Sequence, residues 1–219
     1  VFSSSAAVYG ETDNHLINED HPINPISPYG NSKRSVEIFL RDVHKSSPND
    51  WGIGNLRYFN PIGAHPSGDF GEFPLNTPNN LFPYLCQVAN CSRDKLYIFG
   101  KDWPTQDGTC IRDYIHIMDL AEGHISAMQY IEKKENEFFE VINLGTGFGT
   151  SVIELVKTFE NANNLEIKYE FTYRREGDKA IIFADPTLAK IILNWKPKKN
   201  LVDMCRDGWN WQLKNPKGY

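Results

Sequence analysis

Hydrophobic residues occur along the chain in short blocks whose spacing alternates between that of strands and that of helices. Val1 and Phe2 open a predicted buried strand that runs into the small-residue turn SSSAA. From Ser27 onward, apolar residues recur at helical spacing, and residues 53–59 form the next predicted strand, which Pro61 is expected to end. A strand, a helix and a strand in this order indicate a parallel α/β sheet.

The same alternation continues to the end of the chain. Residues 61–82 are rich in Pro, Gly and Asn and have no period, which is typical of a long functional loop. Beyond it we expect helices over 83–90, 119–132 (with Asp119 as the cap), 186–193 and 201–213, and strands over 96–99, 138–144 and 167–171.

The helix that begins at Ser27 and Pro28 places Tyr29 and Lys33 on one face with Val36, Leu40 and Val43. On the same helical wheel, Glu37 falls on the polar side. Lysine is rarely buried without a partner. Two interpretations therefore stay open: Tyr29 and Lys33 form a catalytic pair, or Lys33 extends from the edge of the stripe into solvent. Spacing alone does not decide, because Tyr97/Lys101 and Tyr130/Lys134 match it too.

Composition limits the function classes. The 219 residues are 40% hydrophobic and 23% charged, which is typical of a globular protein. A net charge of −5 without a Lys/Arg block argues against nucleic-acid or anionic membrane partners. No apolar run is long enough to cross a bilayer. The four cysteines show no CxxC pair and no clustered histidines, so we expect no metal site, no disulfide framework, and reduced thiols in the cytoplasm.

Candidate chemistry lies where the first predicted strand ends. Ligand sites of open α/β sheets lie at the carboxyl ends of strands, and Ser3, Ser4 and Ser5 close this one. A serine there is expected to hydrogen-bond the same group that Tyr29 reaches. A nearby ammonium favours the ionised phenolate, so a Ser/Tyr/Lys set suits proton transfer to or from an alcohol.

Two arginine sites point to phosphate. Arg112 precedes an Asp-Tyr pair, and Arg174, Arg175 and Asp178 share a predicted loop. Guanidinium groups suit bidentate contacts with phosphate oxygens. Surface ion pairs are the alternative, and for Arg174 the favoured one.

The segment NLGTGFGTS follows a strand and precedes a helix, where phosphate-binding glycines are found. Thr150 stands where the third Gly of the dinucleotide fingerprint belongs. We therefore expect a structural turn with Thr150 or Ser151 capping the helix.

A set of segments spread over essentially the whole chain resembles the UDP-glucose 4-epimerase family of extended short-chain dehydrogenases/reductases: FSSSAAVYG, SPYGNSK, LRYFNPIGAHPSG, PNNLFPY, IFGKDWPTQDGTCIRDYIHIMDLAEGH, NLGTGFGTSV and RREGD. The resemblance favours the catalytic interpretation of Tyr29 and Lys33. It implies an α/β fold with a partial Rossmann-type, doubly wound parallel sheet and a smaller mixed α/β substrate domain. Residues 1–60 and 118–145 would belong to the NAD-binding domain, and 61–117 and 146–219 to the UDP-sugar-binding domain.

The activity implied by the resemblance is reversible 4-epimerisation of UDP-glucose and UDP-galactose, a reaction of galactose metabolism that passes through transient NADH and a 4-keto sugar. Tyr29 would be the general base toward the sugar 4-hydroxyl, with Ser5 bonded to the same oxygen. Lys33 would hold the nicotinamide ribose. The cofactor NAD would contact Ser5, Tyr29, Lys33 and Phe59.

The resemblance also assigns substrate contacts. Arg112 and Arg175 would clamp the diphosphate, and Asp178 would contact the uridine ribose. Ile182 stands where family members carry a bulky aromatic or a small residue, so activity on UDP-N-acetylhexosamines stays open. The remaining contacts would be Asn60, Asn80, Leu81 and the uracil-pocket residues Tyr97, Ile98 and Phe99.

The family's Gly-rich NAD loop is not in this sequence, which opens without Met. We therefore expect a piece of a longer protein that alone neither retains NAD nor turns over. The resemblance leaves open a homodimer of the full-length protein. Two alternatives are a nucleotide-sugar 4,6-dehydratase, which needs a carboxylate pair where Ala6 and Ala7 stand, and a non-catalytic UDP-sugar binder.

Overall fold

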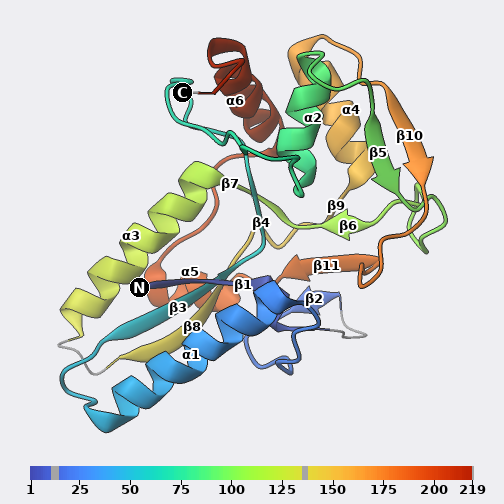
Figure 1. Cartoon of the computed structure of the whole chain (residues 1–219). Coiled ribbons are helices and arrows are strands. Elements are labelled where there is room, and N and C mark those ends of the chain that lie inside the picture. The colour runs from blue at the N-terminus through green and yellow to red at the C-terminus, as the bar shows by residue number, and fades with distance from the viewer. Residues whose placement is uncertain (11–14, 135–137, 219) are drawn as a thin grey trace.

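A three-stranded parallel sheet forms the centre of the first structural layer (Figure 1). The computed structural model describes residues 1–10, 15–134 and 138–218. The sheet contains β1 (Phe2–Ser5), β3 (Ile53–Tyr58) and β8 (Phe139–Leu144) in the order β1-β3-β8. The predicted parallel α/β arrangement is confirmed.

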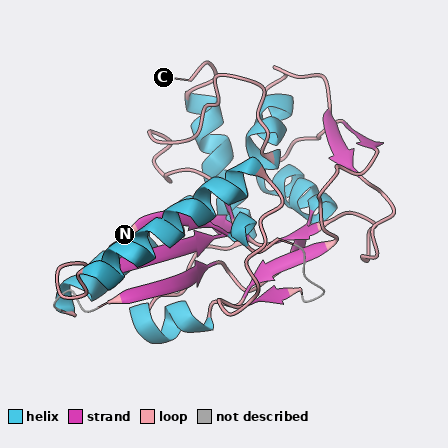
Figure 2. Cartoon of the chain, turned by 60° about the horizontal axis from the view of Figure 1, so that its bottom comes forward, coloured by secondary structure: helices cyan, strands magenta, loops and turns pink. Residues whose placement is uncertain are grey.

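Helices cover both faces of this sheet (Figures 1 and 2). On one face α1 (Pro28–Ser46) packs on β1 and β3, and on the other α3 (Ile117–Lys133) packs on β3 and α5 (Thr187–Leu193) on β8. The core between the sheet, α3 and α5 includes Leu56, Ala127, Ile142, Ala189 and Leu193. The helix α5 thus packs in the layer assigned to residues 1–60 and 118–145, although it belongs to the predicted second segment; the domain division itself stays a prediction.

A second unit packs α2 (Leu81–Ala89), α4 (Val152–Asn163) and α6 (Leu201–Lys214) beside a parallel pair of strands, β5 (Leu96–Phe99) and β10 (Tyr169–Thr172). Its core includes Phe82, Leu85, Leu155, Phe159 and Met204. These elements lie within a few residues of their predicted positions.

Short strands join the two units. A four-stranded sheet has the order β2 (Leu16–Ile17), β11 (Ile181–Ala184), β6 (Ile111–Arg112) and β9 (Thr150–Ser151), and β4 (Asn60–Ile62) pairs with β7 (Tyr114–His116). The predicted strand 53–59 is observed as β3, which ends at Tyr58, before Pro61. Pro61 itself lies in the separate short strand β4, which pairs with β7. Proline is tolerated there because a two-stranded sheet has only edge strands.

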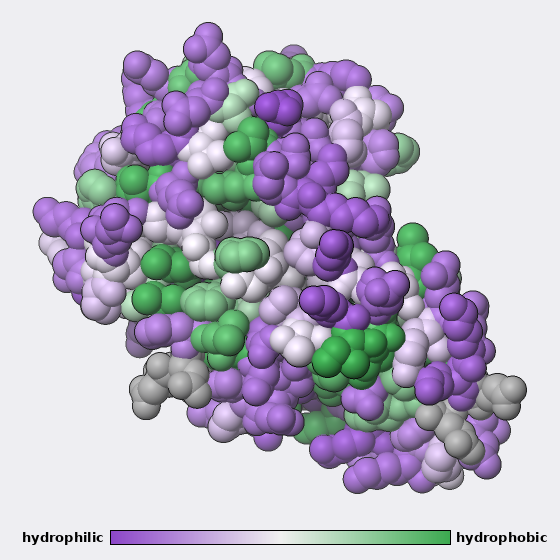
Figure 3. Space-filling view, turned by 180° about the vertical axis from the view of Figure 1, so that it is seen from behind, coloured by the Kyte–Doolittle hydropathy of each residue, from purple (hydrophilic) through white to green (hydrophobic). Residues whose placement is uncertain are grey.

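Hydrophilic residues cover most of the face seen from behind, with apolar residues in separate patches (Figure 3). Among the described helices, none has the length and hydrophobicity that crossing a bilayer requires.

The buried face of α1 differs from the helical wheel in one respect. Glu37, expected on the polar side, is only 6% exposed, whereas Val36 and Phe39 are 38% and 65% exposed. Glu37 accepts hydrogen bonds from Arg57 Nε (2.9 Å) and Nη2 (2.6 Å), and the Ser4 hydroxyl donates to the same carboxylate. An ion pair with β3 therefore overrides the local hydrophobic pattern.

This ion pair belongs to a polar row across the sheet. Ser4, Arg57 and Asn143 are neighbours in register on β1, β3 and β8. The Arg57 guanidinium lies 4.8 Å from the centroid of the Tyr9 ring, and the Tyr9 hydroxyl donates to Asn143 Oδ1 at 2.6 Å. Burial raises the pKa of Tyr9 to about 12, so its phenol is neutral.

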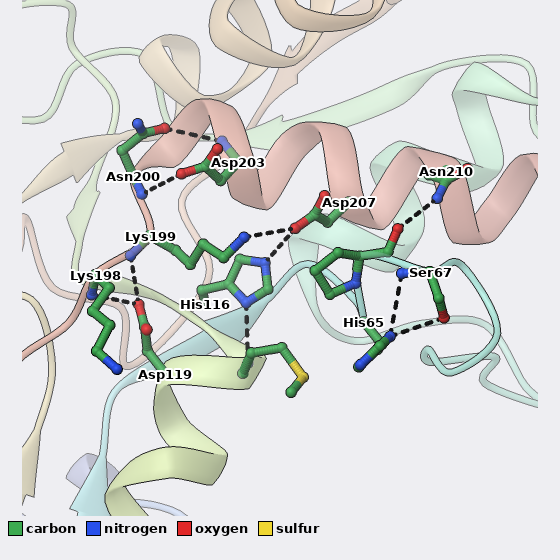
Figure 4. Close-up of polar contacts among 12 residues, drawn as sticks. His65, Ser67, His116, Asp119, Lys198, Lys199, Asn200, Asp203, Asp207 and Asn210 are labelled. Carbon is green, nitrogen blue, oxygen red and sulfur yellow. Dashed lines mark hydrogen bonds and ion pairs between the residues drawn. The ribbon is translucent and has the colours of Figure 1, made fainter.

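The helix α3 begins with His116 as its cap, and the expectation that Asp119 caps it is wrong. His116 Nδ1 accepts from the Met118 N–H at 3.0 Å, so the ring hydrogen is on Nε2, which lies 3.1 Å from Asp207 of α6 (Figure 4). Lys199 Nζ lies 3.6 Å from the same carboxylate. The cap of α3 is therefore also an anchor for α6.

Asp119 has a different partner. Its carboxylate accepts the backbone N–H groups of Lys198 and Lys199 at 3.0 and 2.9 Å, which holds the segment before α6 (Figure 4). At the far side of Figure 4, Asn210 of α6 donates to the Pro66 carbonyl, so the long loop after β4 also attaches to this helix.

We predict that Arg57→Met lowers the free energy of unfolding by about 3–5 kcal/mol, because it leaves the Glu37 carboxylate buried without its partner. The double variant Arg57→Met/Glu37→Leu should recover most of this loss. Urea unfolding measures both, with Arg41→Met, which removes an exposed ion pair to Asp42, as the control. Equal losses in the single and double variants would contradict the role assigned to the pair.

A second prediction concerns pH. Burial lowers the pKa of His116 below its ordinary 6.5. As the pH falls, this histidine therefore binds a proton at a higher pH in the unfolded chain than in the folded protein. The stability that is fully present above about pH 6.5 is lost as the pH falls from there through the lowered pKa of the folded protein. In His116→Asn, whose amide can still accept from the Met118 N–H, we expect a smaller decrease in the urea midpoint between about pH 7.5 and pH 5.5. The same decrease in both proteins would assign the loss to other groups.

Candidate active site

A cavity of about 1160 Å³ lies where the carboxyl ends of β1 and β3 face the second unit. Its wall combines segments from both ends of the chain. Of the site residues predicted from the sequence, all except Lys33 line it: Ser5, Tyr29, Phe59, Asn60, Asn80, Leu81, Tyr97, Ile98, Phe99, Arg112, Arg175, Asp178 and Ile182.

The start of α1 brings Tyr29 to this cavity. Ser27 is the N-cap and accepts from the Gly30 N–H at 3.0 Å, with Pro28 in the first turn. A Cβ on Gly30 would lie 2.5 Å from the Ala7 carbonyl oxygen, so a glycine is needed for the helix to approach the turn after Ser5 this closely. Tyr29 remains 51% exposed and accessible to a ligand.

Lys33 lies beside Tyr29 but outside the cavity wall. Its Nζ donates to the Ser3 carbonyl at 2.8 Å and lies 5.5 Å from the centroid of the Tyr29 ring. Ser5 is buried and accepts from the Ala7 N–H at 3.2 Å through its hydroxyl oxygen. Because that contact uses a lone pair, the Ser5 hydroxyl hydrogen remains available to a ligand oxygen.

Sequence reasoning missed Tyr58, which also lines the cavity. Burial raises the pKa of Tyr58, and the interaction with the adjacent Tyr29 phenol raises it further. Tyr58 is the last residue of β3 and is in register with Ser5 on β1. Its position opposite Ser5 could have identified Tyr58 as a site residue, but the sequence alone does not show how β1 and β3 pair.

The opposite end of the cavity is basic. Arg112 donates from Nη1 to the Lys179 carbonyl at 2.8 Å, and its Nη2 lies 3.3 Å from Asp178 Oδ1. The Arg175 guanidinium lies 4.3 Å from the centroid of the Phe99 ring. Arg174 does not line the cavity and forms the surface ion pair expected of it, with Asp102.

Polar and apolar side chains complete the wall. Asn60 is exposed, and Asn80 occupies the N-cap position of α2 without a side-chain capping bond, so both amides can reach a ligand. Ile182, in β11, packs partly buried against the cluster that contains Tyr9 and Phe59.

The Gly-rich segment NLGTGFGTS folds around a carboxylate of its own chain. Asp113 accepts from the Thr146 hydroxyl (2.6 Å) and from the N–H groups of Thr146 (2.9 Å), Gly147 (3.0 Å) and Ala184 (3.1 Å). Ser151 caps α4 in a capping box with Glu154. The segment is therefore a structural turn, as predicted, with Ser151 as the cap.

These features define a Rossmann-type α/β protein with its ligand cavity at the carboxyl ends of the parallel strands. The family model described as GDP-mannose 4,6 dehydratase matches residues 1–208. The chain belongs to this family.

Among curated relatives, the chain is 50% identical over 219 residues to a UDP-glucose 4-epimerase of Bacillus subtilis and 52% identical to UDP-glucose 4-epimerase 2 of Oryza sativa. All of the chain is matched, but it spans 64% and 53% of those proteins. The crystal structure of UDP-glucose 4-epimerase from Bifidobacterium longum in complex with NAD+ and UDP has a TM-score of 0.93 at 45% identity, covering 100% of this chain and 64% of that one.

We predict that Asp113→Asn destabilises the protein by about 1–3 kcal/mol, because an amide NH2 replaces one oxygen that faces N–H and hydroxyl donors. Chemical unfolding measures the change. Asp185→Asn is the matched control, since the Asp185 carboxylate accepts the nearby Thr187 N–H at 3.0 Å and an amide oxygen can replace it. Equal effects of the two substitutions would contradict the central position given to Asp113.

Proposed function

We propose that the full-length protein catalyses the reversible 4-epimerisation of UDP-glucose and UDP-galactose with NAD as its cofactor. One observation carries the proposal: a single cavity is lined by Ser5 and Tyr29 at one end and by Arg112 and Arg175 at the other. A hexose between a proton-transfer set and a basic diphosphate site matches that arrangement. The identity to curated UDP-glucose 4-epimerases supports it.

The side chains around Tyr29 suit the nicotinamide ribose of NAD. Lys33 supplies an ammonium group fixed on the Ser3 carbonyl, Ser5 supplies a hydroxyl, and Phe59 offers a buried ring at the end of β3. NAD, when bound, supplies the reversible oxidation at C4 of the sugar.

The protein's own residues handle the proton of the sugar 4-hydroxyl. Tyr29 accepts it as general base and returns it in the reverse step. The Lys33 ammonium lies beside the phenol, 5.5 Å from the centroid of the Tyr29 ring, and Ser5 donates to the same sugar oxygen. Tyr58 lines the same part of the cavity, where its phenol interacts electrostatically with that of Tyr29.

Binding residues fix the nucleotide at the other end. Arg112 and Arg175 are assigned to the diphosphate, for which guanidinium groups offer bidentate donors. Asp178 is assigned to the uridine ribose. We further assign the amides of Asn60 and Asn80 to sugar or phosphate oxygens, and assign Leu81, Tyr97, Ile98, Phe99 and Ile182 to apolar and backbone contacts with uracil and hexose.

A 4,6-dehydratase activity is disfavoured by two residues. Ala6 and Ala7 follow Ser5 and line the cavity. Elimination of water across C5 and C6 needs a carboxylate there to move protons, and a methyl side chain cannot do so.

We also propose that the protein acts in the cytoplasm. All four cysteines lie in the described part of the chain as free thiols, and Cys86, Cys110 and Cys205 are buried. Burial raises the pKa of the Cys205 thiol to about 12, which keeps it protonated and unreactive.

In the full-length protein, Tyr29→Phe should lower kcat for UDP-galactose by about 10²–10⁴-fold, because the general base is lost, while KM stays within a few-fold. Chromatographic separation of UDP-glucose from UDP-galactose measures the rate. Tyr130→Phe is the control, because Tyr130 precedes Lys134 at the same spacing but packs on Phe138, away from the cavity.

UDP binding without interconversion by the unsubstituted protein would replace this proposal with the non-catalytic UDP-sugar binder. Full activity of Tyr29→Phe would remove Tyr29 from the mechanism.

A further inference from the structure

The loop between β10 and β11, residues 173–180, carries two of the proposed binding residues. Arg175 and Asp178 both line the cavity, and the Asp178 N–H donates to the Arg175 carbonyl at 3.2 Å. Gly177 between them has a φ of +77°, which favours glycine. The two binding residues are thus the ends of one tight turn.

Arg174, one residue earlier, makes its contacts outside the cavity. Its Nε donates to Asp102 Oδ1 at 2.8 Å, and its Nη2 donates to the Asp102 carbonyl oxygen. The guanidinium also lies 4.2 Å from the centroid of the Trp103 ring. Arg174 is therefore fixed outside the cavity, whereas its neighbour Arg175 lines it.

Trp103 links this contact to the cavity wall. Its Nε1 donates to the Phe99 carbonyl at 3.1 Å, and the Phe99 ring lies under Arg175. Gly100, between Phe99 and Trp103, has a φ of +83°, and a Cβ there would lie 2.4 Å from Trp103 Nε1 and 3.0 Å from Arg174 Cγ. The junction is close-packed around a position that only glycine fits.

We propose that Arg174 is a positioning residue for nucleotide binding. Together with Asp102 and Trp103 it forms a latch, here called the Arg174 latch, that holds loop 173–180 against the end of β5 with Arg175 facing the ligand diphosphate. This inference rests on the proposed function, because it assumes that the cavity takes a UDP-sugar. Arg174 thus influences the affinity for the nucleotide although it does not touch it.

The contacts of the latch set the size of its effect. The Arg174 and Asp102 side chains are 42% and 71% exposed, and ion pairs and cation–π contacts at such sites are individually weak. The latch therefore orders the loop without determining the stability of the whole fold. Its loss should weaken nucleotide binding by about three- to tenfold, in line with the energies of those contacts.

The test uses the full-length protein with Arg174→Met, Asp102→Ala and the double variant. Calorimetry with UDP should show a Kd raised by about three- to tenfold in Arg174→Met. The rise should be smaller in Asp102→Ala, which leaves Arg174 its contacts with the Asp102 carbonyl oxygen and the Trp103 ring. The double variant should resemble Arg174→Met, because the ion pair that Asp102→Ala removes is already absent there. KM for UDP-galactose should rise in parallel while kcat stays within about twofold, since the proton-transfer end is untouched.

Two controls separate positioning from a general structural effect. Lys157→Met removes a similar exposed combination, an ion pair to Glu160 with a contact to the Tyr169 ring, and should leave UDP affinity unchanged. Uridine lacks the diphosphate but keeps the ribose assigned to Asp178 of the same loop, so its affinity should fall less than that of UDP in the Arg174→Met protein.

Unchanged UDP affinity in Arg174→Met, with normal binding by the unsubstituted protein, would overturn the latch alone. An equal loss for uridine and UDP would also overturn it, because the effect would not pass through Arg175. Absence of UDP binding by the unsubstituted protein would overturn the proposed function and the latch with it.

Discussion

The buried ion pair between Glu37 and Arg57 is the interaction on which the arrangement of the site depends. Its two hydrogen bonds fasten α1 to β3, and the Ser4 hydroxyl adds β1 to the same carboxylate. Tyr29 and Lys33 lie on α1 eight and four residues before Glu37, so the position of the helix over the sheet determines where these two side chains lie relative to β1. A buried pair of this kind adds little net stability over a well-packed apolar core. Its contribution is to fix one arrangement of helix and sheet.

Asp113 plays a comparable part in the second half of the chain. Parallel sheets bring glycine-rich turns to their carboxyl ends, where backbone N–H groups attract an anion. Here the anion is an internal carboxylate, so the turn after β8 joins β7 and β11. The same backbone geometry that serves nucleotide binding elsewhere thus serves the internal packing of this chain.

Local features of the fold could be predicted from the sequence, because spacing and turn chemistry act within a few residues. This holds for α1, β5 and the turn capped by Ser151. Glu37 was assigned to the polar face because its partner Arg57 lies on another element. His116 was missed as the cap because the partners that distinguish it from Asp119 come from the distant α6 region: Asp207 contacts His116, and the backbone N–H groups before α6 donate to Asp119. Residue type and spacing indicated Tyr29 and Lys33 as a candidate pair, and the resemblance favoured the catalytic interpretation. The predictions for Asn60 and Ile182 came from resemblance alone. Tyr58 needed the register of two strands.

The pairing of β11 with β2 has a consequence for biosynthesis. Residues 183 and 184 form a ladder with residues 16 and 17, so this pairing joins segments that lie far apart in the sequence. At ribosomal rates of about 5–20 residues per second, β2 waits on the order of ten seconds or more for β11. During that interval the edges of the parallel strands are open to other chains. Contacts of such long sequence separation also slow folding, so the strand edges of the nascent chain stay exposed at least until β11 has emerged.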